Sequence, residues 1–212
     1  LNVNPTTGEL FTAIPVADLP IAATSLTLNL HHRSQRSLDG PVGNNWTMEC
    51  FARIFGPPGA NVTMLDGRGH VGNFTSLGGG AYTSPAGWYC TMTWTGGQFI
   101  VKWPHNEQWF FDPAGRFSAM TTRNGTGYTA TYDIAGNLIN LLDSNGRLAI
   151  LAYYPTGRLY SWTDWWFEGG LTRSTLFSYD NGGDLVSVCK PGTAQHFFQG
   201  PTHNLTYNAS SQ

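Results

Sequence analysis

The sequence predicts an all-β protein of repeated antiparallel β-hairpins, with almost no helix. Three observations lead to this prediction: alternating apolar and polar residues, frequent turn residues, and the lack of an apolar stripe longer than two helical turns. The segments SLTLNLHH, FIVKW and GYTATYD alternate as strands do, and most such runs end in glycine, Asn-Gly or Asp-x-x-Gly. Glycine occurs 26 times and proline 12 times in 212 residues, which interrupts any long helix.

The composition narrows the possible partners and the location. Charged residues make up only 11% of the chain and the formal net charge is -2, so we expect no nucleic-acid partner. No run of about 18 apolar residues occurs, and we therefore expect no membrane span. Thr, Asn, Ser and Gly take the place of charged residues, as is common in extracellular proteins. Because the chain starts at Leu1, without an initiator methionine, we expect a mature, exported protein.

One phrase occurs four times in the second half of the chain, in WFFDPAGRFSAM, ATYDIAGNLINL, AYYPTGRLYSW and FSYDNGGDLVSV. The aromatic residues that align are Phe111, Tyr132, Tyr153 and Tyr179, with separations of 21, 21 and 26 residues. A glycine follows four positions later in each unit, at Gly115, Gly136, Gly157 and Gly183. Two apolar residues come next, at Phe117 and Met120, Leu138 and Leu141, Leu159 and Trp162, and Leu185 and Val188. Columns in register over four units establish a repeat.

Each unit is interpreted as a strand, a tight turn and a second strand. Asp112, Asp133 and Asp180 follow the aromatic residue, where a carboxylate can bond turn amides, and Tyr154 takes this position in the third unit. The glycine supplies the positive φ that a short hairpin needs. The two apolar residues are three apart, which places them on opposite faces of an ideal strand, so we expect a bulge between them. An insertion around TDWWFEGG delays the fourth unit and should lengthen one hairpin.

The units resemble YD repeats, which occur in Rhs proteins, in shell-forming components of insecticidal toxin complexes and in teneurins. The phrases VNPTTGEL, LTLNLHHRS and DGPVGNNW resemble the segment that opens many bacterial Rhs-type chains. In this chain Asn45 replaces the glycine usual before Trp46, and no tyrosine follows Arg33. The resemblance covers about residues 3–190 and implies an extended, twisted YD-repeat sheet, as a partial spiral or open barrel. Four units are too few to close a shell, and the family's carboxy-terminal autoproteolytic phrase is missing.

The resemblance suggests three segments. An opening β segment spans residues 1–97 and begins with an extended N-terminal arm at about 1–23. The YD-repeat sheet spans 98–190, with units near 109–125, 130–146, 151–170 and 176–190, and a C-terminal strand or tail spans 191–212. Because open sheet ends expose unpaired backbone groups, the arm and the tail either cap their own sheet or add to the next molecule.

We therefore expect an extracellular structural protein that assembles with itself head to tail, as a filament or surface fibre. One alternative is a carbohydrate-binding or adhesion module, and another is a fragment of an Rhs-type toxin-encapsulating shell. The inserted hairpin places aromatic residues where either a sugar or a neighbouring subunit would cover them. These interface or sugar-stacking candidates are Trp165, Trp166 and Phe167.

Two kinds of covalent modification are considered. Six N-x-S/T sequons make a glycoprotein plausible, at Asn45, Asn61, Asn73, Asn124, Asn204 and Asn208. Three cysteines cannot pair completely within one chain. Cys50 and Cys90 lie in strand-like runs and are the candidate disulfide; the alternative is three free thiols, including Cys189.

The sequence shows no pattern of catalytic or metal-binding residues. The repeat aspartates occupy a turn column, which favours capping over catalysis. The six histidines are scattered, and adjacent His31 and His32 point to opposite faces of a strand. We therefore expect no enzyme and no cofactor.

Overall fold

The computed structural model confirms the predicted all-β fold. It describes residues 2–21, 24–168, 171–190 and 202–206, and for residues 17–21, 24–27, 165–168 and 171–172 it describes the backbone alone. Over these ranges the only helical elements are two single 3-10 turns, η1 (Glu49–Phe51) and η2 (Pro104–Asn106). Neither turn has the length or the apolar character that crossing a membrane would require.

The strands form two antiparallel sheets and a short ribbon. The smaller sheet has the order β1 (Asn2–Val3), β2 (Leu10–Ile21), β3 (Thr24–Arg33) and β6 (Trp46–Met48). The larger sheet has 15 strands in chain order: β7 (Arg53–Phe55), β8 (Val62–Leu65), β9 (Val71–Gly78), β10 (Ala81–Thr83), β11 (Thr91–Thr95), β12 (Gln98–Lys102), β13 (Gln108–Phe111), β14 (Phe117–Thr121), β15 (Gly127–Tyr132), β16 (Leu138–Asp143), β17 (Leu148–Tyr153), β18 (Leu159–Glu168), β19 (Leu171–Tyr179), β20 (Leu185–Cys189) and β21 (Thr202–Asn204). The ribbon pairs β4 (Asp39–Gly40) with β5 (Gly43–Asn44).

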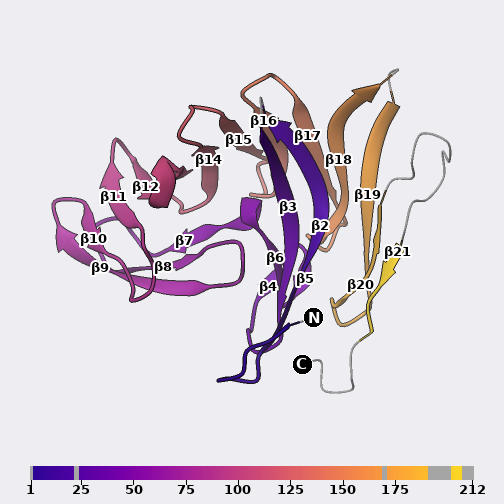
Figure 1. Cartoon of the computed structure of the whole chain (residues 1–212), viewed down its shortest axis with the longest axis horizontal. Coiled ribbons are helices and arrows are strands. Elements are labelled where there is room, and N and C mark those ends of the chain that lie inside the picture. Colours follow the sequence, from indigo (N-terminus) through magenta and orange to yellow (C-terminus); the bar gives the residue numbers. More distant parts are fainter. Residues whose placement is uncertain (1, 22–23, 169–170, 191–201, 207–212) are drawn as a thin grey trace.

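The large sheet is strongly bent and, over the described residues, does not close into a barrel. Figure 1 shows β8–β12 on one side, β18–β21 on the other, and the β2–β3 hairpin between them. Strands β11 and β12 pair directly, so the sheet is continuous across residue 97, the boundary suggested between the opening segment and the repeats.

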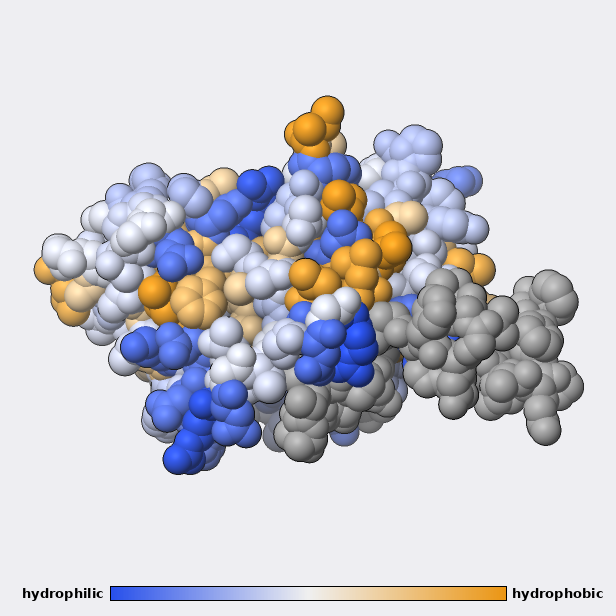
Figure 2. Space-filling view, turned by 90° about the horizontal axis from the view of Figure 1, so that it is seen from above, coloured by the Kyte–Doolittle hydropathy of each residue, from blue (hydrophilic) through white to orange (hydrophobic). Residues whose placement is uncertain are grey.

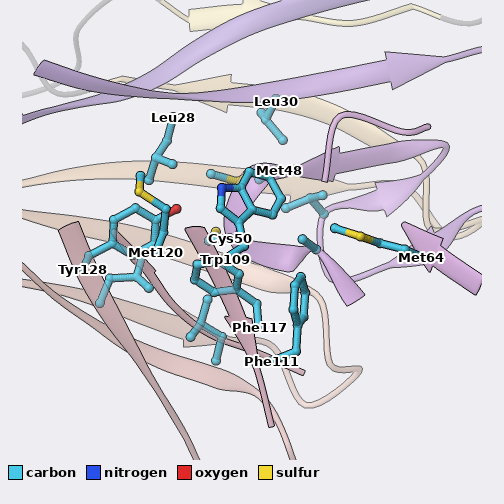
Figure 3. Packing of buried hydrophobic residues seen from close by; sticks show 14 of the residues in the cluster. Leu28, Leu30, Met48, Cys50, Met64, Trp109, Phe111, Phe117, Met120 and Tyr128 are labelled. Carbon is cyan, nitrogen blue, oxygen red and sulfur yellow. The ribbon is translucent and has the colours of Figure 1, made fainter. Parts of the chain in front are cut away.

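The hydrophobic core lies between the small sheet and the inner face of the large one. Leu28 and Leu30 of β3 are fully buried, and Figure 3 shows them directed at side chains of the large sheet. The facing residues include Trp109, Met120 and Tyr128, which are also buried. Each sheet therefore buries the apolar face of the other.

A bulge follows every repeat turn, as the spacing predicts. In the first unit Phe111 pairs with Phe117, but Phe110 pairs with Ala119, so Ser118 is the extra residue. The pairs β15–β16, β17–β18 and β19–β20 show the same shift. Because the extra residue reverses the alternation of faces, both apolar residues point inward. The two apolar residues of every unit, from Phe117 and Met120 to Leu185 and Val188, are at most 3% exposed.

The inserted hairpin is longer than the others, as expected. In the preceding hairpin, β16–β17, Asp143 and Arg147 stand on either side of the turn. Their side chains form an ion pair (2.5 Å), and the Asp143 amide donates to the Arg147 carbonyl. Asp164 and Arg173 form the corresponding pair (2.9 Å), and β18 and β19 continue beyond it. The insertion therefore extends a hairpin whose base keeps the geometry of the repeat.

The first and the last of the described strands both pair within the chain. β2 pairs with β3 along the whole length of β2, with an irregularity at Val16. On the other side of β2, β1 pairs only with Leu10 and Phe11. Pro15 and Pro20 occur in the remaining part of β2, and proline discourages further pairing at a sheet edge because it lacks an N–H group. At the other end of the sheet, β21 pairs with β20.

The β7 end of the large sheet is covered by the first repeat turn. The Ile54 amide donates to the Gly115 carbonyl (2.8 Å), and Arg53 forms a β-bridge with Arg116. Gly115 has a φ of +75°, and a Cβ atom at this position would lie 1.8 Å from the Ile54 oxygen. This glycine is therefore required both by the turn and by the close approach of β7.

We predict that Gly115→Ala destabilises the protein more than Gly125→Ala does. Gly125 has a φ of +76°, but a Cβ atom added there would have no neighbour within 4 Å, so its substitution costs only the left-handed backbone strain of about 1–2 kcal/mol. Gly115→Ala adds the displacement of β7, for a total of about 4 kcal/mol or more. Urea unfolding of the two variants measures the difference, and equal losses would contradict the role given to Gly115.

Candidate functional site

The repeat turns share one design. Each is a turn of five residues in which the glycine amide donates to the carbonyl three residues earlier, at 2.9–3.1 Å. The capping predicted for the aspartates is present: Asp112, Asp133 and Asp180 accept the amide four residues later, at 2.8–2.9 Å. The glycines Gly115, Gly136, Gly157 and Gly183 all have positive φ, between +75° and +87°. The repeat-turn residues therefore fix the tight turns between paired strands.

A ladder of tyrosine hydroxyls connects successive units, and the sequence analysis missed it. Tyr132 donates to the carbonyl of Phe117 (2.6 Å) and Tyr153 donates to that of Leu138 (2.6 Å). Tyr179 continues the series with the carbonyl of Leu159 (2.9 Å). Each acceptor is the first residue of a bulge in the preceding unit. In the first unit Phe111, which has no hydroxyl, stands where the later units have tyrosine. This difference was the sign in the sequence that the hydroxyl has a role in the later units.

Burial raises the pKa of Tyr132, Tyr153 and Tyr179. The cause is desolvation of the phenolate in the partly buried column between units. These hydroxyls therefore remain protonated and available as donors to the bulge carbonyls.

The opening phrase DGPVGNNW docks against the turns of the third and fourth units. The Pro41 carbonyl accepts the Leu159 amide (2.6 Å) and the Tyr179 hydroxyl (3.3 Å). Arg158 contacts the Gly40 carbonyl and is ion-paired with Asp39 (2.5 Å). These contacts therefore hold the β4–β5 ribbon against the third and fourth repeat units of the large sheet.

Asn44 and Asn45 complete this junction. The Asn44 side chain donates to the Gly182 carbonyl (3.0 Å) and to the Asp184 carboxylate (2.9 Å). Asn45 has a φ of +62°, in the left-handed region that asparagine tolerates better than most residues. This explains how asparagine can stand where the resembling segments carry glycine.

An open cleft of about 810 Å³ lies beside the junction. Its walls are the ribbon and the third and fourth repeat turns, and Tyr154, Tyr179 and Asp180 are among its lining residues. A second hollow, of about 640 Å³, lies on the other side of the turn at residues 154–157. The Tyr154 turn thus forms a ridge between two hollows.

A second polar cluster joins the small sheet to the loop that precedes β9. Glu49 accepts the Asn29 amide (3.0 Å) and contacts His31 Nε2 (2.7 Å). In the same region Arg33 is ion-paired with Glu9 (3.0 Å), and Arg33 also contacts His70. These groups are already paired with one another, which favours a structural role.

The histidine and carboxylate of this region have shifted pKa values. Burial acts to raise the pKa of Glu49, but the hydrogen bond and charge of His31 and the Asn29 amide outweigh it, so the pKa is lowered. Burial lowers the pKa of His32, which lies against Trp46 with ring centroids 4.8 Å apart, while Asp184 acts in the opposite direction. Both shifts follow from the packing of β3 on the rest of the molecule.

The candidate disulfide between Cys50 and Cys90 is absent, and the cysteines follow the alternative of three free thiols. Cys50 and Cys90 are both free and buried, and Cys189 is free and half-buried. Cys50 lies in η1, which breaks the strand predicted for this run and turns the thiol into the core. Desolvation raises the pKa of Cys50 and of Cys90, so neither is activated as a nucleophile.

The sequons differ in accessibility. Asn61, Asn73, Asn124 and Asn204 are exposed. Asn45 is half-buried and its side-chain oxygen accepts the Leu38 amide (3.3 Å), so it is the least accessible of the described sites. Asn208 lies outside the described residues.

The large aromatic residues of the repeats divide into those of the core and the interface or sugar-stacking candidates. Trp109 and Trp162 are 4% and 1% exposed and fill the core. For Trp165, Trp166 and Phe167 the structure describes the backbone of β18, and their side chains lie outside that description. No set of three His, Cys, Asp or Glu side chains able to hold a metal ion occurs within the described ranges.

Comparison of the chain with models of known protein families and with characterised proteins found no match. The relation to YD-repeat proteins therefore remains a proposal based on the repeated motifs.

We predict that Tyr153→Phe destabilises the protein by about 1–3 kcal/mol, because the Leu138 carbonyl loses its donor inside the sheet. Tyr160→Phe is the control, since that ring is 42% exposed, and its change should stay within about 0.5 kcal/mol. Chemical unfolding measures both variants. A Tyr153→Phe protein as stable as the native one would show that the ladder contributes nothing.

We predict that acid weakens the fold in two steps. His32 has a lowered folded pKa, so the unfolded chain takes its proton first and stability falls as pH drops below the ordinary 6.5. Glu49 also has a lowered folded pKa, so the stability it contributes above its ordinary 4.5 is lost as pH falls below that value. The urea midpoint, measured from about pH 7.5 to about pH 3.5, should decrease throughout.

His32→Gln should flatten the upper part of this profile and Glu49→Gln the lower part. A midpoint that stays constant, or rises toward low pH, would contradict both assignments.

Proposed function

We propose that the protein is an extracellular structural module of the YD-repeat type that associates with further copies through one open edge of its large sheet. The observation that carries this proposal is the difference between the two ends of that sheet. The β7 end is covered by the Gly115 turn. The β21 end has a neighbour on one side only, as far as the described strands extend.

The open edge presents a backbone donor. Residues 202–204 are exposed, and the Leu205 amide donates to the Val186 carbonyl on β20 (3.0 Å). Amides of successive strand residues point to opposite sides, so the Asn204 amide points away from β20. An unpaired edge of this kind accepts a strand from another chain.

The geometry favours a pair of molecules over a fibre. Two β21 edges that pair antiparallel form a two-fold interface, which closes after two copies. A head-to-tail filament needs a different acceptor, and β1 (Asn2–Val3), which is exposed at the edge of the small sheet, is the candidate. The same β21 edge is where further repeats of a longer Rhs-type chain would add.

The surface supports an extracellular setting. Charged residues are few, and at least four sequons are accessible. The outer face of β16 and β17 also exposes Leu142, Leu148 and Ile150, each between 40% and 48% exposed. Figure 2 shows hydrophobic residues gathered near the middle of one face, between hydrophilic regions. A surface of this kind offers further contact area to an associating copy.

We predict that Asn204→Pro weakens self-association by roughly tenfold or more. The substitution removes the outward amide but no hydrogen bond to β20. Sedimentation velocity over a range of protein concentrations measures the equilibrium, and negative-stain electron microscopy distinguishes pairs from filaments.

Asn204→Ala is the matched control, because it removes the sequon as Asn204→Pro does but keeps the amide, and it should associate as the native protein without a glycan at Asn204 does. Intact mass of the exported native protein and of this variant reports whether Asn204 carries a glycan. A native protein without a glycan at Asn204 that stays monomeric at every concentration, or an Asn204→Pro variant that associates as Asn204→Ala does, would refute the proposed edge pairing.

A further inference from the structure

The cleft beside the β4–β5 ribbon has the chemical character of a sugar site. It measures about 810 Å³ and is open to solvent on one side. Its lining combines two half-buried tyrosine rings with hydroxyl, amide and carboxylate groups. These groups belong to Asp39, Tyr154, Ser178, Tyr179, Asp180 and Asn181.

Tyr154 is fixed in position by its neighbours. Its hydroxyl donates to the Phe177 carbonyl (3.1 Å), and its ring meets those of Tyr160 and Tyr179 edge to face, with centroids 5.1 and 6.2 Å apart. This residue occupies the position of the turn aspartate in the other units. The third repeat has thus exchanged a capping carboxylate for an immobilised ring at the wall of the cleft, which adds apolar area at little entropic cost.

Polar groups surround the ring. Asp180 uses Oδ1 to accept the amides of Gly182 and Asp184, both at 2.9 Å, which fixes the carboxylate in place. Its second oxygen is the one available to a ligand hydroxyl. Asn181 is exposed at the rim and offers both a donor and an acceptor, and Ser178 adds a hydroxyl.

The charged side chains of the cleft disfavour an anionic ligand. Arg158 is the cation in the lining, and it is engaged by Asp39 and by the Gly40 carbonyl. The carboxylates of Asp39 and Asp180 remain in the wall. An anionic ligand would therefore meet like charges, whereas a neutral hydroxylated one would not.

We propose that this cleft binds a neutral sugar unit of a polysaccharide. A pyranose has an apolar C–H face that fits the Tyr154 ring and hydroxyl groups that fit the surrounding acceptors and donors. The second hollow shares the turn at residues 154–157, so a chain of sugars has room on both sides of the ridge. The site does not use the β21 edge and is independent of the proposed self-association.

The test is native affinity electrophoresis of the full chain in gels that contain galactomannan, xyloglucan, dextran or, as the acidic polymer, polygalacturonate. We expect retardation by at least one neutral polymer and none by polygalacturonate. Tyr154→Leu and Asn181→Ala should each raise the apparent dissociation constant by about tenfold. Tyr154→Phe keeps the ring and should be retarded like the native protein.

Ser144→Ala is the matched control for Asn181→Ala, since both residues are exposed and directly follow the capping aspartate of a repeat-type turn. Thermal unfolding verifies that each variant is folded, and Asn204→Pro should leave the retardation unchanged. The proposal is overturned if no neutral polymer retards the protein, if polygalacturonate retards it equally, or if folded Tyr154→Leu and Asn181→Ala proteins are retarded as strongly as the native one.

Discussion

The bulge after each repeat turn is the constraint on which the rest of the structure depends. It reverses the alternation of faces, so that two apolar residues three positions apart both enter the core. It also takes one carbonyl out of the regular ladder, and the tyrosine of the next unit donates to that carbonyl. One irregularity in the strand pairing therefore has three consequences. It buries the core residues, it links successive units, and it requires tyrosine in the aromatic position of the later repeat units.

The tyrosine ladder begins and ends with contacts of two different kinds. At the beginning Phe111 has no hydroxyl to place, and the first turn instead packs Gly115 against Ile54 of β7. At the end Tyr179 bonds to Pro41 as well as to Leu159, so the opening segment receives the last hydroxyl. The opening segment and the repeats thus complete one another, because neither buries its inner face alone.

The sequence predicted the features that are encoded locally. The turn column, the positive-φ glycines and the bulge depend on residues within one unit, and their spacing is sufficient to identify them. The partner of Tyr153 is Leu138, 15 residues away in the preceding unit, and no pattern within one unit indicates it. The contact between Glu49 and His31 likewise depends on how β3 lies over η1.

The candidate disulfide between Cys50 and Cys90 is absent for a related reason, and the alternative of three free thiols holds. WTMECFARIF reads as one strand, but the chain forms the single turn η1 after Met48 and turns Cys50 inward. The cleft beside the ribbon also escaped the sequence, because the third and fourth turns meet the opening segment from more than 100 residues away. Only the exchange of aspartate for Tyr154 marked that turn as different.

A sheet that is covered at the β7 end and has no second neighbour at β21 among the described strands imposes a limit on the proposed assembly. Pairing through the open edge alone ends at two copies, so growth into a fibre requires the short β1 edge as a second acceptor. A glycan at Asn204 would affect this edge, because the sequon lies on the outermost described strand. A strand side chain leaves from the face of a sheet, so a glycan there would leave the backbone groups free but crowd an incoming strand. A glycan at Asn204 would therefore oppose the proposed pairing through β21, and the proposed pair would form from the bare chain only.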